Sequence, residues 1–151
     1  MKILTVLCQK GGVGKTTFVV NLGKLLSHKG YKTLLIDTDP QGNVSTYLNF
    51  DKNSKAVLSA TDLFENRLDK DITKVSENLY LIPSNKSIIK HSSEKIIGGS
   101  KLFKHKNFLI EKGFDLVLID TPPTISSLTQ ESLTISAVSY THLRAHETHN
   151  D

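Results

Sequence analysis

Four short apolar runs are predicted to form the strands of a buried sheet. They lie at residues 3–7, 32–37, 79–82 and 114–120, and each is rich in leucine, isoleucine or valine. Runs of this length without polar alternation are typical of strands that are covered on both faces. The third run is closed by Pro83, Ser84 and Asn85, which favour a turn.

The segments between these runs carry helical signals. After the first strand, apolar residues recur at helical spacing and predict a helix over 16–29 that ends at Gly30. Further helices are expected over 54–64, with Thr61 and Asp62 able to cap a second short one, and over 100–112 and 126–136. A strand, helix and strand in this order form a right-handed crossover in a parallel sheet. The predicted fold class is α/β, a mostly parallel sheet flanked by helices.

A glycine-rich loop, Gln9-Lys-Gly-Gly-Val-Gly-Lys-Thr-Thr17, joins the first strand to the first helix. Such a loop directs several backbone N–H groups at one point, and the helix dipole adds positive charge there. A phosphate chain fits this position, with Lys15 reaching the β- and γ-phosphates and the Thr16 hydroxyl ligating magnesium. The strict motif requires glycine at position 9, where this chain has glutamine.

Carboxylates follow two of the predicted strands. Asp37 and Asp39 lie in a loop after the second strand, and Asp120 ends the fourth. In isolation such residues are compatible with solvated turns. Ligands of parallel sheets sit at the carboxyl ends of strands, where the glycine loop also emerges. Beside a phosphate loop, these carboxylates are expected to support magnesium or to orient an attacking water.

Composition limits the possible classes of protein without indicating a function. The 151 residues suffice for one domain, and the net charge of +4 permits acidic partners without requiring them. The one cysteine, Cys8, excludes an internal disulfide and cannot build a multi-cysteine cluster, so a cluster-bridging reductase is disfavoured. Neither a membrane span nor a signal peptide is expected, which predicts a cytoplasmic protein.

Lysines are concentrated on the helix predicted over 100–112, at positions 101, 104, 106 and 112. A solvated face is the favoured interpretation. A DNA-facing patch is the alternative, and it lacks the interleaved aromatic residues that a stacking platform requires.

The lysine at the front of the glycine loop gives Lys10-Gly-Gly-Val-Gly-Lys-Thr-Thr17, which resembles the deviant Walker A motif of the ParA/MinD ATPases. The loop Asp37-Thr-Asp-Pro-Gln-Gly-Asn43 resembles the second motif of the ParA branch, and the run ending Asp120-Thr-Pro-Pro123 resembles a Walker B element. The resemblance implies a P-loop NTPase that uses ATP and Mg²⁺ as cofactors.

This resemblance also implies roles for individual residues. Lys10 would cross a dimer interface to the partner's nucleotide, and Asp39 would activate water. Asp37 would support both the metal and Thr16, and Asp120 would hold magnesium through a water. The ATP-binding residues implied are Lys10, Gly11, Gly12, Val13, Gly14, Lys15, Thr16 and Thr17, and the catalytic ones Lys10, Lys15 and Asp39.

Members of this family dimerise around two ATP molecules, bind DNA non-specifically in the ATP state and are released when a ParB-type partner stimulates hydrolysis. The resemblance therefore implies a partition ATPase for plasmid or chromosomal DNA, associated with the nucleoid when ATP-bound, with no membrane partner expected. One alternative is a MinD-like positioning ATPase, which would need an amphipathic membrane-binding helix. Another is a nucleotide-binding remnant without turnover.

The resemblance extends over residues 1–136, and members of the family are longer. We therefore expect a fold truncated before its C-terminal strands. Residues 137–151 resemble a translated sequencing adaptor and are expected to be non-native. The histidines at 142, 146 and 149 are accordingly not expected to form a metal site.

Overall fold

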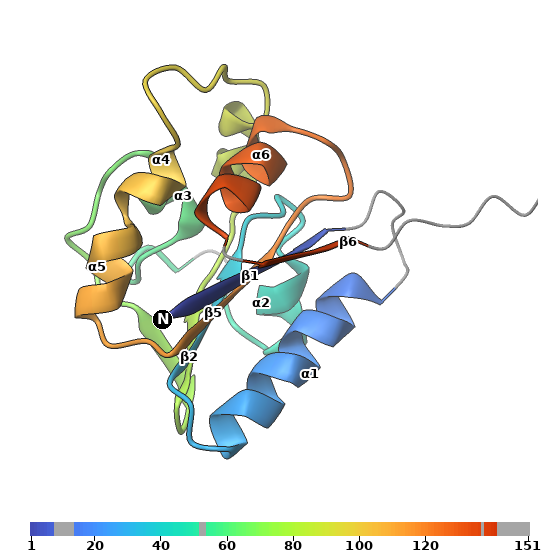
Figure 1. Ribbon diagram of the computed structural model, residues 1–151, viewed down its shortest axis with the longest axis vertical. Coiled ribbons are helices and arrows are strands. Elements are labelled where there is room, and N and C mark those ends of the chain that lie inside the picture. Colours follow the sequence, from blue (N-terminus) through green and yellow to red (C-terminus); the bar gives the residue numbers. More distant parts are fainter. Residues whose placement is uncertain (8–13, 52–53, 137, 142–151) are drawn as a thin grey trace, which may run out of the picture.

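A six-stranded sheet forms the centre of the computed structural model, which describes residues 1–7, 14–51, 54–136 and, for the backbone, 138–141 (Figure 1). The strand order is β3-β4-β2-β5-β1-β6. All neighbouring strands are parallel except β3 and β4, which are antiparallel. The strands are β1 (Lys2–Leu7), β2 (Thr33–Asp37), β3 (Thr73–Ser76), β4 (Leu79–Ile82), β5 (Leu116–Asp120) and β6 (Val138–Thr141).

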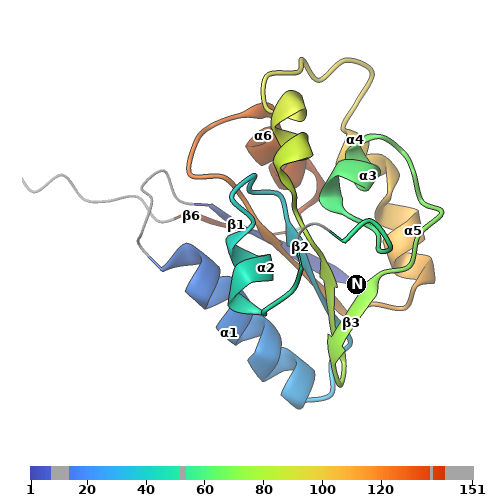
Figure 2. The ribbon, with the colours of Figure 1, turned by 180° about the vertical axis from the view of Figure 1, so that it is seen from behind.

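Helices cover the sheet on two sides, as Figures 1 and 2 show. One layer contains α1 (Lys15–His28) and α2 (Asn43–Tyr47). The other contains α3 (Ala60–Phe64), the 3₁₀ helix η1 (Lys86–His91), α4 (Lys101–Lys104), α5 (Lys106–Glu111) and α6 (Ser127–Ile135).

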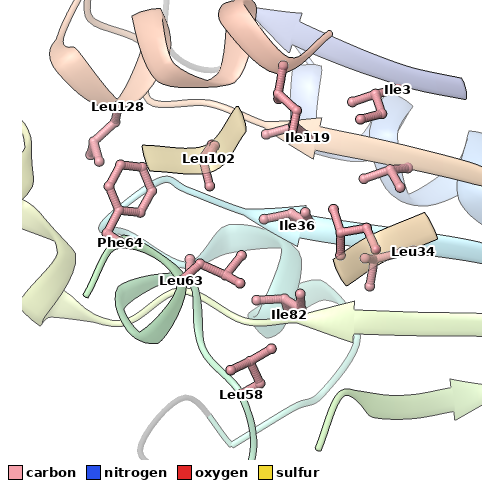
Figure 3. Close-up of a cluster of buried hydrophobic side chains, with 14 of the residues drawn as sticks. Ile3, Leu34, Ile36, Leu58, Leu63, Phe64, Ile82, Leu102, Ile119 and Leu128 are labelled. Carbon is pink, nitrogen blue, oxygen red and sulfur yellow. The ribbon is translucent and has the colours of Figure 1, made fainter. Parts of the chain in front are cut away.

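The alternation of side chains along each strand divides the core between these layers. On β2, Leu35 packs with Val19 and Val20 of α1. Its neighbours Leu34 and Ile36 belong to the second cluster, which reaches Leu63 of α3, Leu102 of α4 and Leu128 of α6 (Figure 3). Both faces of β2 are covered, which explains why Leu34, Leu35 and Ile36 form an uninterrupted apolar run in the sequence.

Helix α1 approaches β2 closely at Gly23. A Cβ atom at this position would lie 2.7 Å from Leu35 Cδ2, so only glycine fits without displacing a buried leucine. This close approach fixes the helix beneath the sheet, and with it the direction in which the α1 N-terminus points.

The strands and helices predicted from the apolar runs are confirmed, with differences at several elements. The helix expected over 54–64 occupies only Ala60–Phe64, since Ser59 caps it by accepting a hydrogen bond from the Asp62 N–H. The helix expected over 100–112 is divided at His105, whose buried ring nitrogen Nε2 lies 2.7 Å from the Leu63 carbonyl oxygen. Strand β3 and helix α2 were not expected.

The tail beyond residue 136 contributes one described element. The backbone of β6 pairs with β1 in parallel register, with Leu4 opposite Val138. The expectation that this tail is non-native remains a prediction. Among the described residues no helix is long and apolar enough to cross a membrane.

Candidate nucleotide-binding site

The candidate site lies at the carboxyl ends of the three adjacent strands β1, β5 and β2. In the sheet register, Asp120 stands opposite Val6 of β1 on one side and Asp37 of β2 on the other. Helix α1 begins beside these strand ends, so its N-terminal partial positive charge is directed at the same region. The sheet thus brings together residues that are more than a hundred positions apart in the chain.

Lys15 and Thr16 of the first turn of α1 both contact Asp120. The Lys15 ammonium forms an ion pair with Asp120 Oδ1 and also donates to the Thr121 carbonyl oxygen. The Thr16 hydroxyl donates to Asp120 Oδ2 at 2.9 Å. Both oxygens of the Asp120 carboxylate are therefore occupied by residues of the predicted phosphate loop.

Asp37 and Asp39 are buried next to this pair, with side chains 0% and 4% exposed. The Asp39 backbone N–H donates to Asp37 Oδ1 at 3.1 Å, and Asp39 Oδ1 accepts from the Gln41 N–H at 3.0 Å. The other oxygen of Asp37, Oδ2, is buried and has no hydrogen-bond partner among the described residues. A buried carboxylate oxygen without a hydrogen-bond partner is stabilised when a cation binds to it.

The electrostatics of the site favour added positive charge. Burial raises the pKa of Asp37 well above its ordinary range, and the nearby charge of Asp120 raises it further. Burial also raises the pKa of Asp120, although the Lys15 ammonium works against this rise. A ligand that brings a divalent cation relieves the repulsion between these carboxylates.

Two threonines that the sequence did not single out hold the strand ends together. The Thr38 backbone N–H and hydroxyl both donate to the Asp120 carbonyl oxygen, at 2.9 and 2.8 Å. The Thr121 hydroxyl donates to the Val6 carbonyl oxygen at 2.9 Å. Their position directly after a strand-ending aspartate was the available signal. They act as positioning residues, because their contacts fix backbone rather than a ligand.

The phosphate loop itself is described only from Gly14 onward. Gly14 has φ +85°, a left-handed conformation that favours glycine, and its carbonyl accepts the first helical hydrogen bond from the Phe18 N–H at 2.8 Å. Thr17 follows in the first turn and is exposed. The predicted residues Lys10, Gly11, Gly12 and Val13 lie outside the described residues.

The residues present fit a magnesium ion held jointly with phosphates. No group of three or more His, Cys, Asp or Glu side chains in the described part of the chain is arranged to hold a metal alone. Mg²⁺ in phosphate sites takes one or two carboxylates, with substrate oxygens and water completing an octahedron. Asp120, the Thr16 hydroxyl and the unpartnered oxygen of Asp37 supply donors of that kind.

Comparison with known proteins agrees with this geometry. The profile of the AAA domain family AAA_31 matches residues 1–142. The sporulation initiation inhibitor protein Soj of Bacillus subtilis is 36% identical over 139 residues, covering 89% of this chain and 55% of Soj.

Solved structures give the same result. A plasmid partition protein of Borrelia burgdorferi bound to AMPPNP superposes with a TM-score of 0.79 at 31% identity, covering 93% of this chain and 61% of that protein. A cobyrinic acid a,c-diamide synthase of Mycobacterium smegmatis, with an ATP analogue and magnesium, gives 0.81 at 29% identity, covering 95% and 60%. The chain spans about half the length of the curated relatives it matches.

Fold and site together define a P-loop NTPase, as the sequence predicted. Within that class, the chain belongs to the AAA domain family AAA_31, and over most of its length it is similar to ParA/Soj-type proteins.

Proposed function

We propose that this chain binds ATP with Mg²⁺ and that the protein to which it belongs hydrolyses ATP. One observation carries the proposal. Two consecutive residues at the start of α1, Lys15 and Thr16, meet both oxygens of Asp120 at the end of a different strand. A lysine, a hydroxyl and a carboxylate at a helix N-terminus are the groups that a magnesium-bound triphosphate requires.

Each residue takes a distinct part in this proposal. Lys15 exchanges its contact with Asp120 for the β- and γ-phosphates. Thr16 and Asp120 would hold the magnesium ion, with Asp37 supporting it from the neighbouring strand β2, and the ion would supply positive charge to the phosphates. Asp39 orients the attacking water, since its carboxylate lies beside the metal ligands on a loop anchored to both Asp37 and Gln41.

Similarity to known proteins supports a proposal for the activity of the complete protein. Solved relatives are a plasmid partition protein bound to AMPPNP and a synthase bound to an ATP analogue and magnesium, which supports both cofactors. Curated relatives include chromosome-partitioning ATPases. We therefore propose an ATP-dependent homodimer that acts in plasmid or chromosome segregation with a ParB-type partner and non-specific DNA. Lys10 reaches the second nucleotide, and the protein works in the cytoplasm on the nucleoid.

Titration with a fluorescent ATP analogue in the presence of Mg²⁺ tests nucleotide binding. We expect Lys15→Ala to weaken binding by about a hundredfold, because a charge-assisted contact to phosphate is lost in a partly buried site. Lys24→Ala, on the exposed side of the same helix, is the matched control and should bind like the parent. Equal affinity of parent and Lys15→Ala would rule the assignment out. Phosphate release by the same samples separates an ATPase from a remnant that binds without turnover.

A further inference from the structure

Helices α4 and α5 carry an outer surface that the nucleotide site does not use. The two helices follow one another with only His105 between them. Leu102 and Leu109 point into the core, at 1% exposure each, whereas their neighbours Phe103 and Ile110 are 52% and 48% exposed. Figure 3 shows Leu102 directed toward the buried cluster. The helix pair is therefore amphipathic, with a second apolar stripe facing outward.

Phe103 of α4 and Ile110 of α5 each follow a buried leucine directly, and both are exposed, so each helix adds an apolar side chain to the outer surface of the pair. The loop that leads into α4 adds Ile97, which is 83% exposed and lies next to Gly98 and Gly99. Both ribbon views place this loop and the two helices along the same outer edge, away from α1 (Figures 1 and 2). We define the α4–α5 face by the apolar residues Ile97, Phe103 and Ile110 and by the neighbouring lysines Lys104 and Lys106.

Lysines surround these apolar side chains. Residues 94–112 contain five lysines and two glutamates, a net charge of +3, whereas the whole chain carries +4. Lys106 Nζ lies 5.7 Å from the centre of the Phe103 ring, and Lys112 Nζ 5.4 Å from that of Phe108. Lys104 is exposed and has no ion pair among the described residues. A basic segment of the chain thus coincides with exposed apolar side chains.

We propose that the α4–α5 face docks on an anionic lipid surface. Lysines with exposed phenylalanine and isoleucine are the composition of interfacial helices, in which ammonium groups meet lipid headgroups and apolar side chains enter the acyl boundary. Charge complementarity selects an anionic partner. A nucleic acid backbone would use the lysines and gain nothing from Ile97 or Ile110, and lysines already cover the phenylalanine rings on which bases would stack. The sequence analysis expected no membrane partner, and docking on lipid through this face goes beyond that expectation.

The chain contains no tryptophan, so a single introduced tryptophan reports on this face alone. Phe103→Trp is mixed with vesicles of phosphatidylcholine containing phosphatidylglycerol, without nucleotide. We expect a blue shift of its emission that is absent with pure phosphatidylcholine and is lost at high salt. Leu25→Trp, equally exposed at 53% on α1, is the matched control and should not shift.

Co-sedimentation with the same vesicles then separates the contributions. Lys104→Gln with Lys106→Gln should weaken binding roughly fivefold per lysine. Phe103→Ser with Ile110→Ser should weaken it about tenfold or more. Leu25→Ser on α1 with Lys29→Gln directly after α1 should bind like the parent. Circular dichroism confirms folding of every variant, and the lysine pair, being on the surface, keeps the test decisive if the serine pair unfolds.

Three outcomes would overturn the proposal: no sedimentation of the parent chain with anionic vesicles, equal losses in the α1 control, or binding of duplex DNA that the lysine pair abolishes while vesicles are ignored. The inference is independent of the proposed ATP chemistry, because no vesicle experiment includes nucleotide.

Discussion

Substitution of Asp37 by asparagine tests the electrostatic reasoning. We expect the Asp37→Asn protein to unfold at a higher temperature and to bind the ATP analogue with Mg²⁺ more weakly. Asp37→Asn keeps the shape of the side chain and the acceptor for the Asp39 N–H. It removes a fully buried carboxylate whose second oxygen has no partner among the described residues. The amide still leaves a polar atom at this buried position, but without charge, and burying an unpaired charge costs more than the roughly 1–3 kcal/mol of an unsatisfied neutral group.

The pH dependence gives the direction of the effect. Burial first, and then the charge of Asp120, raise the pKa of Asp37 well above 3.8. The folded state therefore retains a proton that the unfolded chain releases near pH 4, and the free energy of unfolding falls as pH rises from there through the raised pKa. At pH 7, without nucleotide, Asp37→Asn should unfold at a higher temperature, by about 2–4 °C for each kcal/mol gained.

Thermal unfolding followed by circular dichroism between pH 4 and pH 8 measures both quantities. The parent should lose stability toward neutral pH more steeply than Asp37→Asn. Asp69→Asn, the same change at an exposed carboxylate without an ion pair in the described structure, should follow the parent. If Asp37 supports the metal, the Asn variant should also bind the ATP analogue more weakly in Mg²⁺. If Asp37→Asn unfolded at a lower temperature than the parent and with the same dependence on pH, the conclusion that the buried Asp37 charge destabilises the fold would be refuted.

Two further predictions concern turnover and assembly in the complete protein. Asp39→Ala should retain affinity for the ATP analogue within about threefold, since a water-orienting group is not needed to hold phosphates. Its rate of phosphate release should fall about a hundredfold or more. Release at the parent rate would leave Asp39 as a turn residue. Lys10→Ala should keep nucleotide binding by the monomer but fail to dimerise with ATP in light scattering, and normal dimerisation would remove the proposed cross-subunit role.

The strands, and the residues proposed for the site, could be predicted from the sequence because their signals are local. Leu34, Leu35 and Ile36 form an uninterrupted apolar run, which occurs when both faces of a strand are covered. The order of strand, glycine loop and helix then directs Lys15 and Thr16 toward the strand ends, whatever the rest of the chain does. The resemblance to ParA-type motifs was likewise carried by short stretches, and the family match bears it out.

Tertiary structure alone decided which residues meet. No local pattern states that β5 inserts between β1 and β2, yet that order sets Asp120 beside Asp37 and within reach of Lys15. The contact of His105 with Leu63, which lies at the break between α4 and α5, is equally long-range. The exposure of Phe103 beneath Lys106 depends on which side of that helix pair the sheet covers. A helical period marks an apolar stripe, but only packing determines whether a stripe lies against the core or faces solvent.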